Sequence, residues 1–588
     1  MEDYWRLTDL MHESRIIQDV GRVEREFEKL EKLDSISTVI RRNSVLPMLD
    51  LVKSIWSYIM LSPSVPLSLK LKIRKALKEE DVRLMHEISR IMKNIYSSYK
   101  KAISKKDCTS LIHLNTISLT YHAADIIRVA WKLAFNREPP RFVFVSHHLT
   151  HAASAYYTSG MNKAVGVVID SRGEWESTSI WSIKDGEFER IASLSHPKYS
   201  LGIFYQESGE WIGYGGLEGP AKIMGLAPYG KPNEKFTNVI NELLKVFDEP
   251  KDVPYRIEKV KSSVAVLDYL KSVLGEPIKW DKNGKPLNRD ATDFAWALQH
   301  RVEEAYLATM RWAKELTGLK EAVIAGGVAL NAKANMELLY SDIFNDFFVF
   351  PAANDAGTAV GAALWAYEHV LGGKVKNVKI ENVFWGLEHD EEDIEEALNL
   401  AKRMNYRIEK DVDIEHLVDK LLKNELVVVY QGRAEFGPRA LGHRSIVADP
   451  RIAENWERVN FHKGREWWRP LAPSLLLDHA KEYFIKGEHL PFMIVMERYK
   501  DEEVCKRVPV VCHVDRTARP QTVTTSIDRN WYNLIRAFGQ ETGEYIVMNT
   551  SFNLGGEPLV ETPAQAVLSF TFGGFDALWL EGYLISRR

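Results

Sequence analysis

Residues 141–170 read RFVFVSHHLTHAASAYYTSGMNKAVGVVID and place a histidine-rich segment between two apolar runs. The runs FVFV (142–145) and AVGVVI (164–169) are rich in β-branched and aromatic residues, which favours strands. A helix beginning just after the first run would complete a strand–helix–strand unit. Further short runs of the same kind, EAVIAGG and FFVFP, follow along the chain. This alternation predicts an α/β domain.

Length, composition and charge limit the class of protein. The chain has 588 residues, too many for one hydrophobic core, so we expect two or three domains. A formal net charge of −4 provides no basic field for nucleic acid and no polybasic membrane patch. No apolar run is long enough to span a membrane, and the charged start MEDYWRLTDLMHESR does not resemble a signal peptide. We therefore expect a cytoplasmic protein without a membrane partner.

The three cysteines, Cys108, Cys505 and Cys512, form no C-x-x-C pair. This spacing indicates neither a disulfide framework nor a cysteine zinc site. Unpaired cysteines fit a reducing cytoplasm.

The chain divides into three stretches of different character. Residues 1–140 lack glycine-rich turns and carry charged, helical periodicity, which predicts a helical N-terminal segment. Residues 141–370 form the predicted α/β domain, and 371–380 are a plausible linker. Residues 381–588 again mix strands, such as LVVVYQG and EYIVMNTSF, with helices, and they hold many arginines, lysines and asparagines. The fold class is therefore multidomain α/β.

Two histidines and two aspartates form a candidate metal site. His147 and His151 are four residues apart, so on a helix their rings would lie on one face, one turn apart. Asp170 ends one predicted strand, and Asp355 follows another, at the edge where α/β folds place working residues. A mixed N/O set suits Fe(II), Mn(II) or Zn(II) better than calcium. Read singly, the histidines fit a polar helix start and each aspartate fits a turn or helix cap.

Two glycine-rich segments are candidate nucleotide-binding loops. GGVALNAKAN (326–335) follows a predicted strand and opens a helix, where backbone amides can bind phosphate. Gly326 and Gly327 would let a ligand approach the backbone, and Asn331 could bond a ribose or base edge. EGPAKIMGLAPYG (218–230) is similar, and it contributes Glu218, Lys222 and Gly225.

Nine ordered motifs resemble the NodU/CmcH family of carbamoyltransferases. Five are HHLTHAASAYYTSG, VIDSRGE, EGPAKIMGLAPYG, GGVALNAKAN and NDAGTAVGAAL; four are GRAEFGPRALGHRSIVADPR, KGREWWRPLAP, HVDRTARPQTV and MNTSFNLGGEPLVETP. The resemblance covers roughly residues 141–588. It implies an actin-like ATPase-type domain over 141–370 and a domain similar to threonylcarbamoyl-adenylate synthases over 381–588.

The resemblance also implies a reaction and its cofactors. Carbamoyl phosphate and ATP, with its Mg²⁺, would give carbamoyl-adenylate and pyrophosphate in the C-terminal domain. The carbamoyl group would then move to a hydroxyl of a small acceptor, often a sugar or antibiotic, in the actin-like domain. Family members carry an iron-type divalent metal there, and its ligands match His147, His151, Asp170 and Asp355.

Cations and neutral polar residues inside the matched motifs suit these substrates. Carbamoyl phosphate and ATP bring many negative charges together, which guanidinium groups can neutralise with directed hydrogen bonds. The expected catalytic residues are Arg439, Arg444, Lys463, Arg469 and Arg519, and we expect Arg465, Asn549, Ser551 and Asn553 to bind the cofactor. For any single arginine, the alternative is a solvated surface charge.

Two departures from the family pattern stand out. Family members begin with a strand and a glycine-rich turn that holds a His-Asp pair, and residues 1–140 contain no such hairpin. A second chain could supply this wall of the acceptor site. Arg516 stands where the family usually has glycine, and it could alter carbamoyl phosphate binding.

Other functions remain open from the sequence. A tRNA threonylcarbamoyl-type transferase is one, although the net charge counts against a tRNA partner. A non-catalytic or partner-dependent nucleotide-binding subunit is another, because the opening hairpin is missing. The sequence does not name the acceptor.

Overall fold

The computed structural model describes residues 137–587 except 139, 142, 175, 217, 248–251 and 281–286. Contacts divide the chain into two units, Met1–Ser146 and His147–Arg588. The predicted helical segment and the question of the opening hairpin concern residues 1–140, of which 1–136 and 139 lie outside the described residues. Among its described residues, the second unit contains two large sheets and two small two-stranded ones. We call residues 147–370 the first lobe and residues 381–587 the second lobe.

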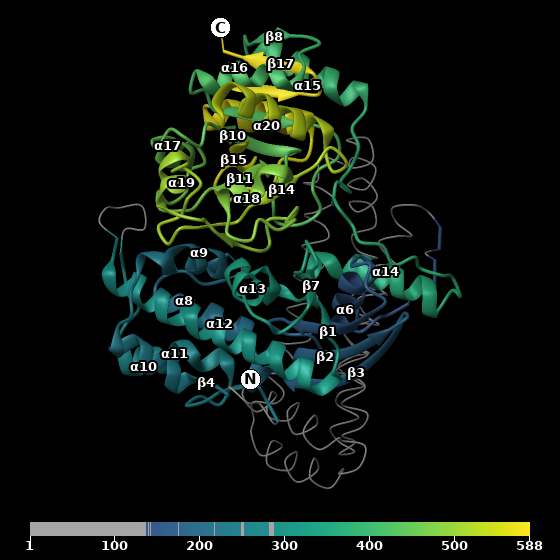
Figure 1. Ribbon diagram of the computed structural model, residues 1–588, viewed down its shortest axis with the longest axis vertical. Helices are drawn as coiled ribbons and strands as arrows, with labels where there is room; N and C mark the ends of the chain where they lie inside the picture. Colours follow the sequence, from purple (N-terminus) through teal and green to yellow (C-terminus); the bar gives the residue numbers. More distant parts are fainter. Residues whose placement is uncertain are drawn as a thin grey trace, which may run out of the picture. The chain divides into compact units, whose positions relative to one another are not determined.

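The first lobe is built on a five-stranded sheet with the order β3–β2–β1–β6–β7 (Figure 1). The strands are β1 (Lys163–Ile169), β2 (Glu176–Lys184), β3 (Glu187–Ser195), β6 (Glu321–Ala325) and β7 (Asp346–Val349). β1 is antiparallel to β2 and parallel to β6, which is parallel to β7. β1 is buried along nearly its whole length, as expected for a central strand covered on both faces. The carboxyl ends of β1, β6 and β7 therefore lie along one edge.

Helices cover both faces of this sheet. α6 (His147–Tyr157) packs against α14 (Thr358–His369), and a Cβ atom at Gly361 would lie 1.8 Å from the carbonyl oxygen of Thr150, so only glycine allows this approach. The other regular elements are α7 (His196–Tyr199), α8 (Leu201–Trp211), α9 (Gly219–Leu226), η1 (Ala227–Tyr229), α10 (Glu234–Leu243), β4 (Leu244–Val246), β5 (Tyr255–Ile257), η2 (Ser263–Ala265), α11 (Val266–Leu274), α12 (Arg289–Thr317), η3 (Gly327–Leu330), α13 (Ala332–Leu339) and η4 (Asp355–Gly357).

The second lobe contains an eight-stranded mixed sheet with the order β14–β11–β15–β10–β9–β16–β17–β8. Its strands are β8 (Arg407–Glu409), β9 (Val427–Tyr430), β10 (Arg444–Ala448), β11 (Ala472–Leu476), β14 (Gln521–Val523), β15 (Ile546–Ser551), β16 (Ala577–Leu580) and β17 (Tyr583–Ser586). Side chains of β9 alternate between two cores, Val428 and Tyr430 in one and Val427 and Val429 in the other. The sheet is therefore buried on both faces.

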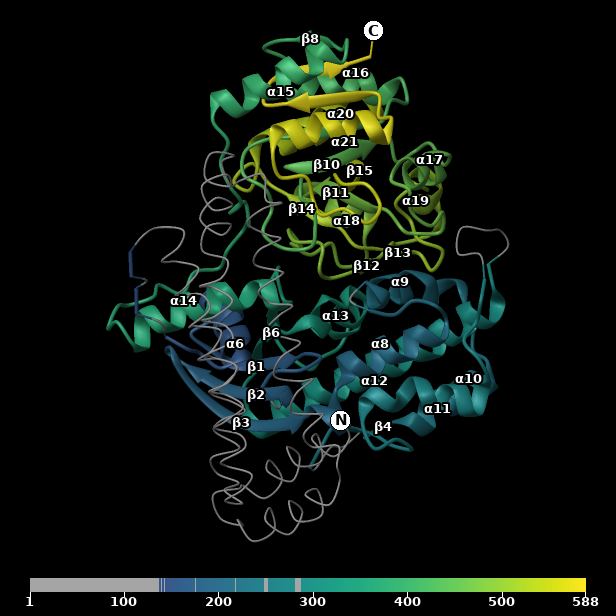
Figure 2. The same ribbon diagram turned by 180° about the vertical axis from the view of Figure 1, so that it is seen from behind.

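The remaining elements of the second lobe cover this sheet or join it to the first lobe. They are α15 (Glu391–Arg403), η5 (Ile414–His416), α16 (Leu417–Leu422), α17 (Asn455–His462), η6 (Leu477–His479), α18 (Ala480–Tyr483), β12 (Glu497–Arg498), α19 (Glu502–Arg507), β13 (Thr517–Ala518), α20 (Arg529–Thr542) and α21 (Pro563–Gly573). From both sides of the molecule, α9 and α13 of the first lobe lie next to the second lobe (Figures 1 and 2). The backbone N–H of Met496, donating to Ala332 O at 3.1 Å, is one of the bonds between them.

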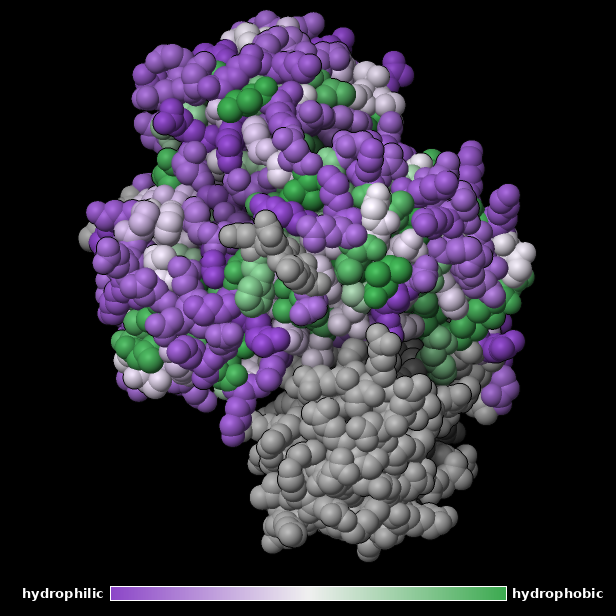
Figure 3. All heavy atoms as spheres, turned by 60° about the horizontal axis from the view of Figure 1, so that its bottom comes forward, coloured by the Kyte–Doolittle hydropathy of each residue, from purple (hydrophilic) through white to green (hydrophobic). Residues whose placement is uncertain are grey.

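The mixed α/β class is confirmed, with one local error. The strands predicted from AVGVVID, EAVIAGG, FFVFP, LVVVYQG and EYIVMNTSF are β1, β6, β7, β9 and β15. The predicted strand at 142–145 is wrong for its described residues, because 143–145 pair with no described strand and Phe144 remains 44% exposed. No described helix has the length and apolar character needed to cross a membrane. Figure 3 shows hydrophobic side chains in small, separate groups on a largely hydrophilic face.

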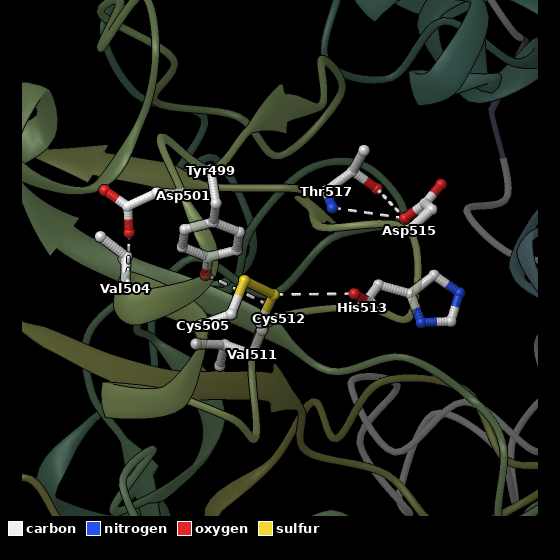
Figure 4. The surroundings of a disulfide bond; sticks show 9 residues. All are labelled: Tyr499, Asp501, Val504, Cys505, Val511, Cys512, His513, Asp515 and Thr517. Carbon is white, nitrogen blue, oxygen red and sulfur yellow. Dashed lines mark hydrogen bonds between the residues drawn. A yellow bond between two sulfur atoms is a disulfide. The ribbon is translucent and has the colours of Figure 1, made fainter.

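The expectation that Cys505 and Cys512 are unpaired is wrong. They form a disulfide, with Cα atoms 5.4 Å apart, in the usual range for such bonds (Figure 4). α19 ends at Arg507, and the chain then turns back so that Cys512 returns to Cys505. The cysteines therefore no longer support the prediction of a reducing compartment.

Replacing Cys505 with serine should destabilise the second lobe. Opening so short a covalent loop removes about 2–3 kcal/mol of stability in the chain-entropy model. We expect the unfolding temperature of the lobe to fall by roughly 5–10 °C. Calorimetry of Cys505→Ser against wild type, both under non-reducing conditions, measures this shift. An equal unfolding temperature for the two proteins would contradict the pairing.

Candidate functional site

Four candidate metal ligands from three separate segments meet at one edge of the first sheet. His147 and His151 lie on α6, Asp170 directly follows β1, and Asp355 begins η4, which follows β7. One ligand atom from each residue lies within 4.8 Å of all the others. The structure thus brings together the four residues expected from the sequence.

The separations of these atoms fit a shared ion. Asp170 Oδ2 lies 3.0 Å from His147 Nε2 and 3.1 Å from His151 Nε2, and the two nitrogens are 3.2 Å apart. Asp355 Oδ1 lies 3.5 and 3.6 Å from the same nitrogens. Ligands at about 2.1 Å from one ion stand roughly 3.0–3.6 Å apart for coordination angles of about 90–120°. Two imidazole nitrogens and two carboxylate oxygens suit a borderline divalent metal such as Fe(II), Mn(II) or Zn(II).

The two carboxylate oxygens of Asp170 have separate partners. Oδ1 accepts hydrogen bonds from the backbone N–H groups of Ser171 (2.7 Å) and Gly327 (3.3 Å), whereas Oδ2 faces both histidines. Burial raises the pKa of Asp170, but hydrogen bonds from His147 and His151 outweigh it and hold the pKa well below its usual value. The carboxylate is therefore ionised and oriented toward the ligand position.

The third histidine of the motif has a different environment. His148 is fully buried, and its Nδ1 lies 2.8 Å from Ser179 Oγ on β2. Burial lowers its pKa well below the ordinary value, so the ring is neutral at pH 7. His148 is thus a packing residue beside the metal-ligand group.

A single cavity of 1040 Å³ extends from this group into the second lobe. Asp170 and Asp355 line it at one side. Residues of the second lobe line the other side, among them Arg439, Lys463, Arg465, Arg469 and Arg519, which we call the basic cluster. One cavity therefore reaches Asp170 and Asp355 as well as most of the cations predicted from the sequence.

The basic cluster holds more positive charge than its neighbours neutralise. Among the described residues, Arg439 and Arg519 have no hydrogen-bond or ion-pair partner, and their Nε atoms are buried. Burial and the nearby Arg469 lower the pKa of Arg439 to about 10, and burial together with Arg439 and Arg469 lowers that of Arg519 well below normal. An anion bound in the cavity would relieve this unfavourable charge.

Neutral polar groups stand beside these cations. Lys463 Nζ donates to Asn553 O at 3.0 Å and to Ser551 Oγ at 3.3 Å, so it braces the loop after β15. Asn549 is fully buried and lines the cavity. Its Nδ2 donates to Ser474 Oγ, while its Oδ1 has no partner among the described residues. Asn549 therefore offers a free acceptor to a ligand N–H group.

The glycine-rich segments lie on the first-lobe side of the cavity. Gly225 and Gly327 line it, while Gly326 supports it from behind: its φ is +90°, and a Cβ there would lie 2.3 Å from Ile169 O. Asn331 lines the cavity, but its side chain caps α13 and pairs with Gln299, so it has less freedom to bind a ribose than expected. The remaining two predicted residues, Glu218 and Lys222, also line the cavity, and Lys222 Nζ lies 3.6 Å from Glu218 Oε2.

Arg444 does not line the cavity, in contrast to its expected role in substrate binding. It is fully buried, and its guanidinium donates to the carbonyl oxygens of Gln431 (2.7 Å), Gly432 (2.9 Å) and His443 (3.0 Å). Its guanidinium carbon also lies 3.6 Å from the centre of the Tyr430 ring. Arg444 therefore holds a backbone turn behind the cavity wall.

Arg516 is also outside the cavity lining, and its side chain is exposed. Its φ of +57° lies in the left-handed region, which explains why glycine is usual at this turn. The position of Arg516 therefore does not support the expectation that it alters carbamoyl phosphate binding.

Several cavity residues were not singled out from the sequence. Glu466 lies in the motif KGREWWRPLAP, is 8% exposed, and contacts Lys222 Nζ at 3.3 Å and Arg469 Nη1 at 3.5 Å. His513 lies in HVDRTARPQTV, and its Nε2 is 3.1 Å from Gly225 O. Both stood inside recognised motifs, but only the fold shows that they contact the other lobe.

Removing one nitrogen ligand should release the metal. We expect His151→Ala to lose at least about ten-fold in affinity for Fe(II) or Zn(II), because no other described donor replaces His151. Metal analysis after equilibration with either ion measures this loss. His148→Gln is the matched control and should keep the ion. Equal metal content in wild type and His151→Ala would refute the assignment.

Arg444→Lys should affect stability rather than anion binding. Lysine cannot reproduce the three carbonyl bonds of a buried guanidinium, so we expect a loss of about 2–4 kcal/mol in unfolding free energy. Denaturant unfolding measures that loss. Calorimetric titration with pyrophosphate below the transition should show less than about a two-fold change in affinity. A stable protein with strongly weakened binding would instead place Arg444 in the anion site.

Models of one enzyme family match most of the chain. "Carbamoyltransferase N-terminus" matches residues 75–364 and "Carbamoyltransferase C-terminus" matches residues 418–587. The first match begins well before residue 141, where the motifs recognised in the sequence start. It therefore extends into the segment that we interpreted as diverged from the family.

The chain is similar to two nodulation proteins over most of its length, and one solved structure aligns with part of it. "Nodulation protein NolNO" of Sinorhizobium fredii is 35% identical over 485 residues, covering 81% of this chain and 69% of the relative. "Nodulation protein NolO" of Bradyrhizobium diazoefficiens is 35% identical over 451 residues, covering 76% and 79%. A full-length HypF structure in a phosphate- and nucleotide-bound form aligns with 41% of this chain and 46% of its own at 14% identity; its TM-score of 0.22 is too low to support an argument. The family models and the two nodulation proteins show that the chain belongs to the carbamoyltransferase family and is a carbamoyl-transferring enzyme.

Proposed function

We propose that the enzyme forms carbamoyl-adenylate in the second lobe and uses it to carbamoylate an acceptor in the first lobe. In the first stage, carbamoyl phosphate, ATP and water give carbamoyl-adenylate, phosphate and pyrophosphate. In the second, the hydroxyl of a small acceptor attacks the carbamoyl carbon. The bond to the adenylate phosphate breaks, AMP leaves, and the hydroxyl loses its proton.

The cavity shared by the two lobes is the observation that carries this proposal. Its second-lobe side presents cations without counterions, which suits the phosphates of carbamoyl phosphate and ATP. Its first-lobe side presents Asp170 and Asp355 of the metal-ligand group. An adenylate formed at the basic cluster can therefore move to the metal-ligand group within one continuous cavity.

The polar groups beside the cluster suit the carbamoyl group. A carbamoyl NH₂ is a hydrogen-bond donor, and the free Oδ1 of buried Asn549 is an acceptor at the cavity wall. Lys463 is surrounded by oxygens of Ser551 and Asn553 and therefore keeps that wall in shape. We assign ligand binding to Arg439, Arg465, Arg469 and Arg519, and support of the loop to Lys463.

The first lobe would hold the metal, the nucleotide and the acceptor. His147, His151, Asp170 and Asp355 would hold a divalent ion, Fe(II) by preference; when bound, the ion would polarise the carbamoyl oxygen or the acceptor hydroxyl. Gly225, Gly327 and Lys222 would contact the adenylate from the first-lobe side. The sheet order, three antiparallel strands followed by two parallel ones, supports the actin-like assignment of this lobe.

Pyrophosphate exchange tests the first stage in the full chain. We expect ATP–pyrophosphate exchange that requires carbamoyl phosphate. Arg439→Gln should slow it by about 10- to 100-fold, because one charge-assisted bond to a phosphate is worth about 1.5–3 kcal/mol. Arg516→Gln is the matched control, since Arg516 is exposed and outside the wall, and it should retain full exchange. Exchange that is absent, or that does not need carbamoyl phosphate, would reject the proposal.

A further inference from the structure

A short turn of the second lobe leads into Arg519 of the basic cluster. We call residues 513–517 the anchor turn. Asp515 Oδ1 lies at its centre and accepts hydrogen bonds from the hydroxyl (2.7 Å) and the backbone N–H (3.3 Å) of Thr517 (Figure 4). Thr517 begins β13, and Arg519 follows β13 directly. The carboxylate therefore sets the backbone from which Arg519 enters the cavity.

The other carboxylate oxygen of Asp515 contacts the first lobe. Asp515 Oδ2 accepts from Lys333 Nζ at 2.8 Å, and Lys333 is the second residue of α13, with 8% exposure. An ion pair with so buried a lysine is screened little by water and keeps a defined geometry. Asp515 thus ties the anchor turn to the helix that follows the glycine-rich loop of the cavity.

The anchor turn is also held at both ends. Its first residue, His513, follows Cys512 of the disulfide, and the His513 ring contacts Gly225 O on α9. At the other end, β13 pairs with β12, with Thr517 opposite Arg498. Between these two ends, the Asp515 carboxylate bonds Thr517 within the turn and Lys333 of the first lobe.

Arg519 depends on such support because no partner of its own holds it. Among the described residues its guanidinium has no hydrogen bond or ion pair, and its neighbours Arg439, Arg465 and Arg469 carry the same charge. Mutual repulsion would move a freely placed guanidinium away from the cluster. A fixed backbone keeps Arg519 beside the other cations.

We infer that Asp515 is a positioning residue, which holds Arg519 at the anion site through Thr517 and Lys333. This inference rests on the proposed function, because it assumes that the basic cluster binds a polyphosphate substrate. Asp515 reaches the ligand only through its partners, since it is not among the residues that line the cavity.

The direction of the change in anion affinity distinguishes a positioning role of Asp515 from a direct electrostatic one. Asp515 is an anion near the cluster, so if its charge alone mattered, Asp515→Asn would make the site more positive and tighten anion binding. Positioning predicts the reverse. We expect Asp515→Asn to weaken binding of inorganic pyrophosphate to the full chain by about ten-fold, the usual effect of one displaced charge-assisted bond.

A double-mutant cycle tests whether Asp515 acts through Arg519. In an Arg519→Gln background, Asp515→Asn should change pyrophosphate affinity by less than about two-fold, whereas a general loosening of the fold would weaken both backgrounds equally. Lys333→Met should weaken pyrophosphate binding to a similar extent as Asp515→Asn. Asp501→Asn is the matched control, because Asp501 caps nearby α19 and lies outside the cavity lining; its affinity should equal that of wild type.

Calorimetric titration with pyrophosphate gives each affinity, and thermal unfolding checks that each variant is folded. Should Asp515→Asn fail to fold, Lys333→Met removes the ion pair at a residue outside the cavity lining and must weaken binding in the same way. Unchanged or tighter binding, or equal weakening in both backgrounds, overturns the positioning role and leaves the proposed function intact. A wild-type chain that binds no pyrophosphate overturns the anion site itself.

Discussion

The carboxylate of Asp170 is the contact on which the first half of the site depends. Asp170 directly follows β1, a buried central strand, so the sheet sets its position. One of its oxygens binds backbone N–H groups, including that of Gly327 after β6, and the other faces two histidines of α6. Two consecutive elements, α6 and β1, thus meet the distant Gly327 segment at one side chain. Without it, the histidines would face each other across 3.2 Å with no buried negative charge between them.

The second half of the site contains like charges, in contrast to the Asp170 carboxylate and its partners in the first half. The basic cluster has few counterions among the described residues, so the folded protein keeps its guanidinium groups together through backbone and covalent supports. The disulfide, the bonds of Lys463 to the loop after β15, and the anchor turn are such supports. The like charges of these guanidinium groups repel one another, and a bound anion would reduce that repulsion.

Much of the site was predictable because its signals are local. A helical spacing of four residues puts His147 and His151 on one face, and strand ends place Asp170 and the segment before Asp355 at a common edge. The arginines were less predictable. Arg439 and Arg444 look alike within GPRALGHR, yet Arg439 lies in a loop at the cavity, while Arg444 begins β10 and pairs in register with Tyr430 of β9. Strand register decides which one contacts a ligand, and no local pattern encodes it.

By itself, the sequence determined the α/β class, the positions of most strands, the residues of the metal-ligand group and, through its ordered motifs, the carbamoyltransferase family. Only the tertiary structure decided that Cys505 and Cys512 pair, that Arg444 is buried behind the wall, and that Lys333 and Asp515 join the two lobes. The physical reason is the distance along the chain over which each kind of signal acts. Periodicity and strand-end chemistry act over a few neighbouring residues, whereas these contacts depend on how separate elements fold back onto one another, which no short stretch of sequence specifies.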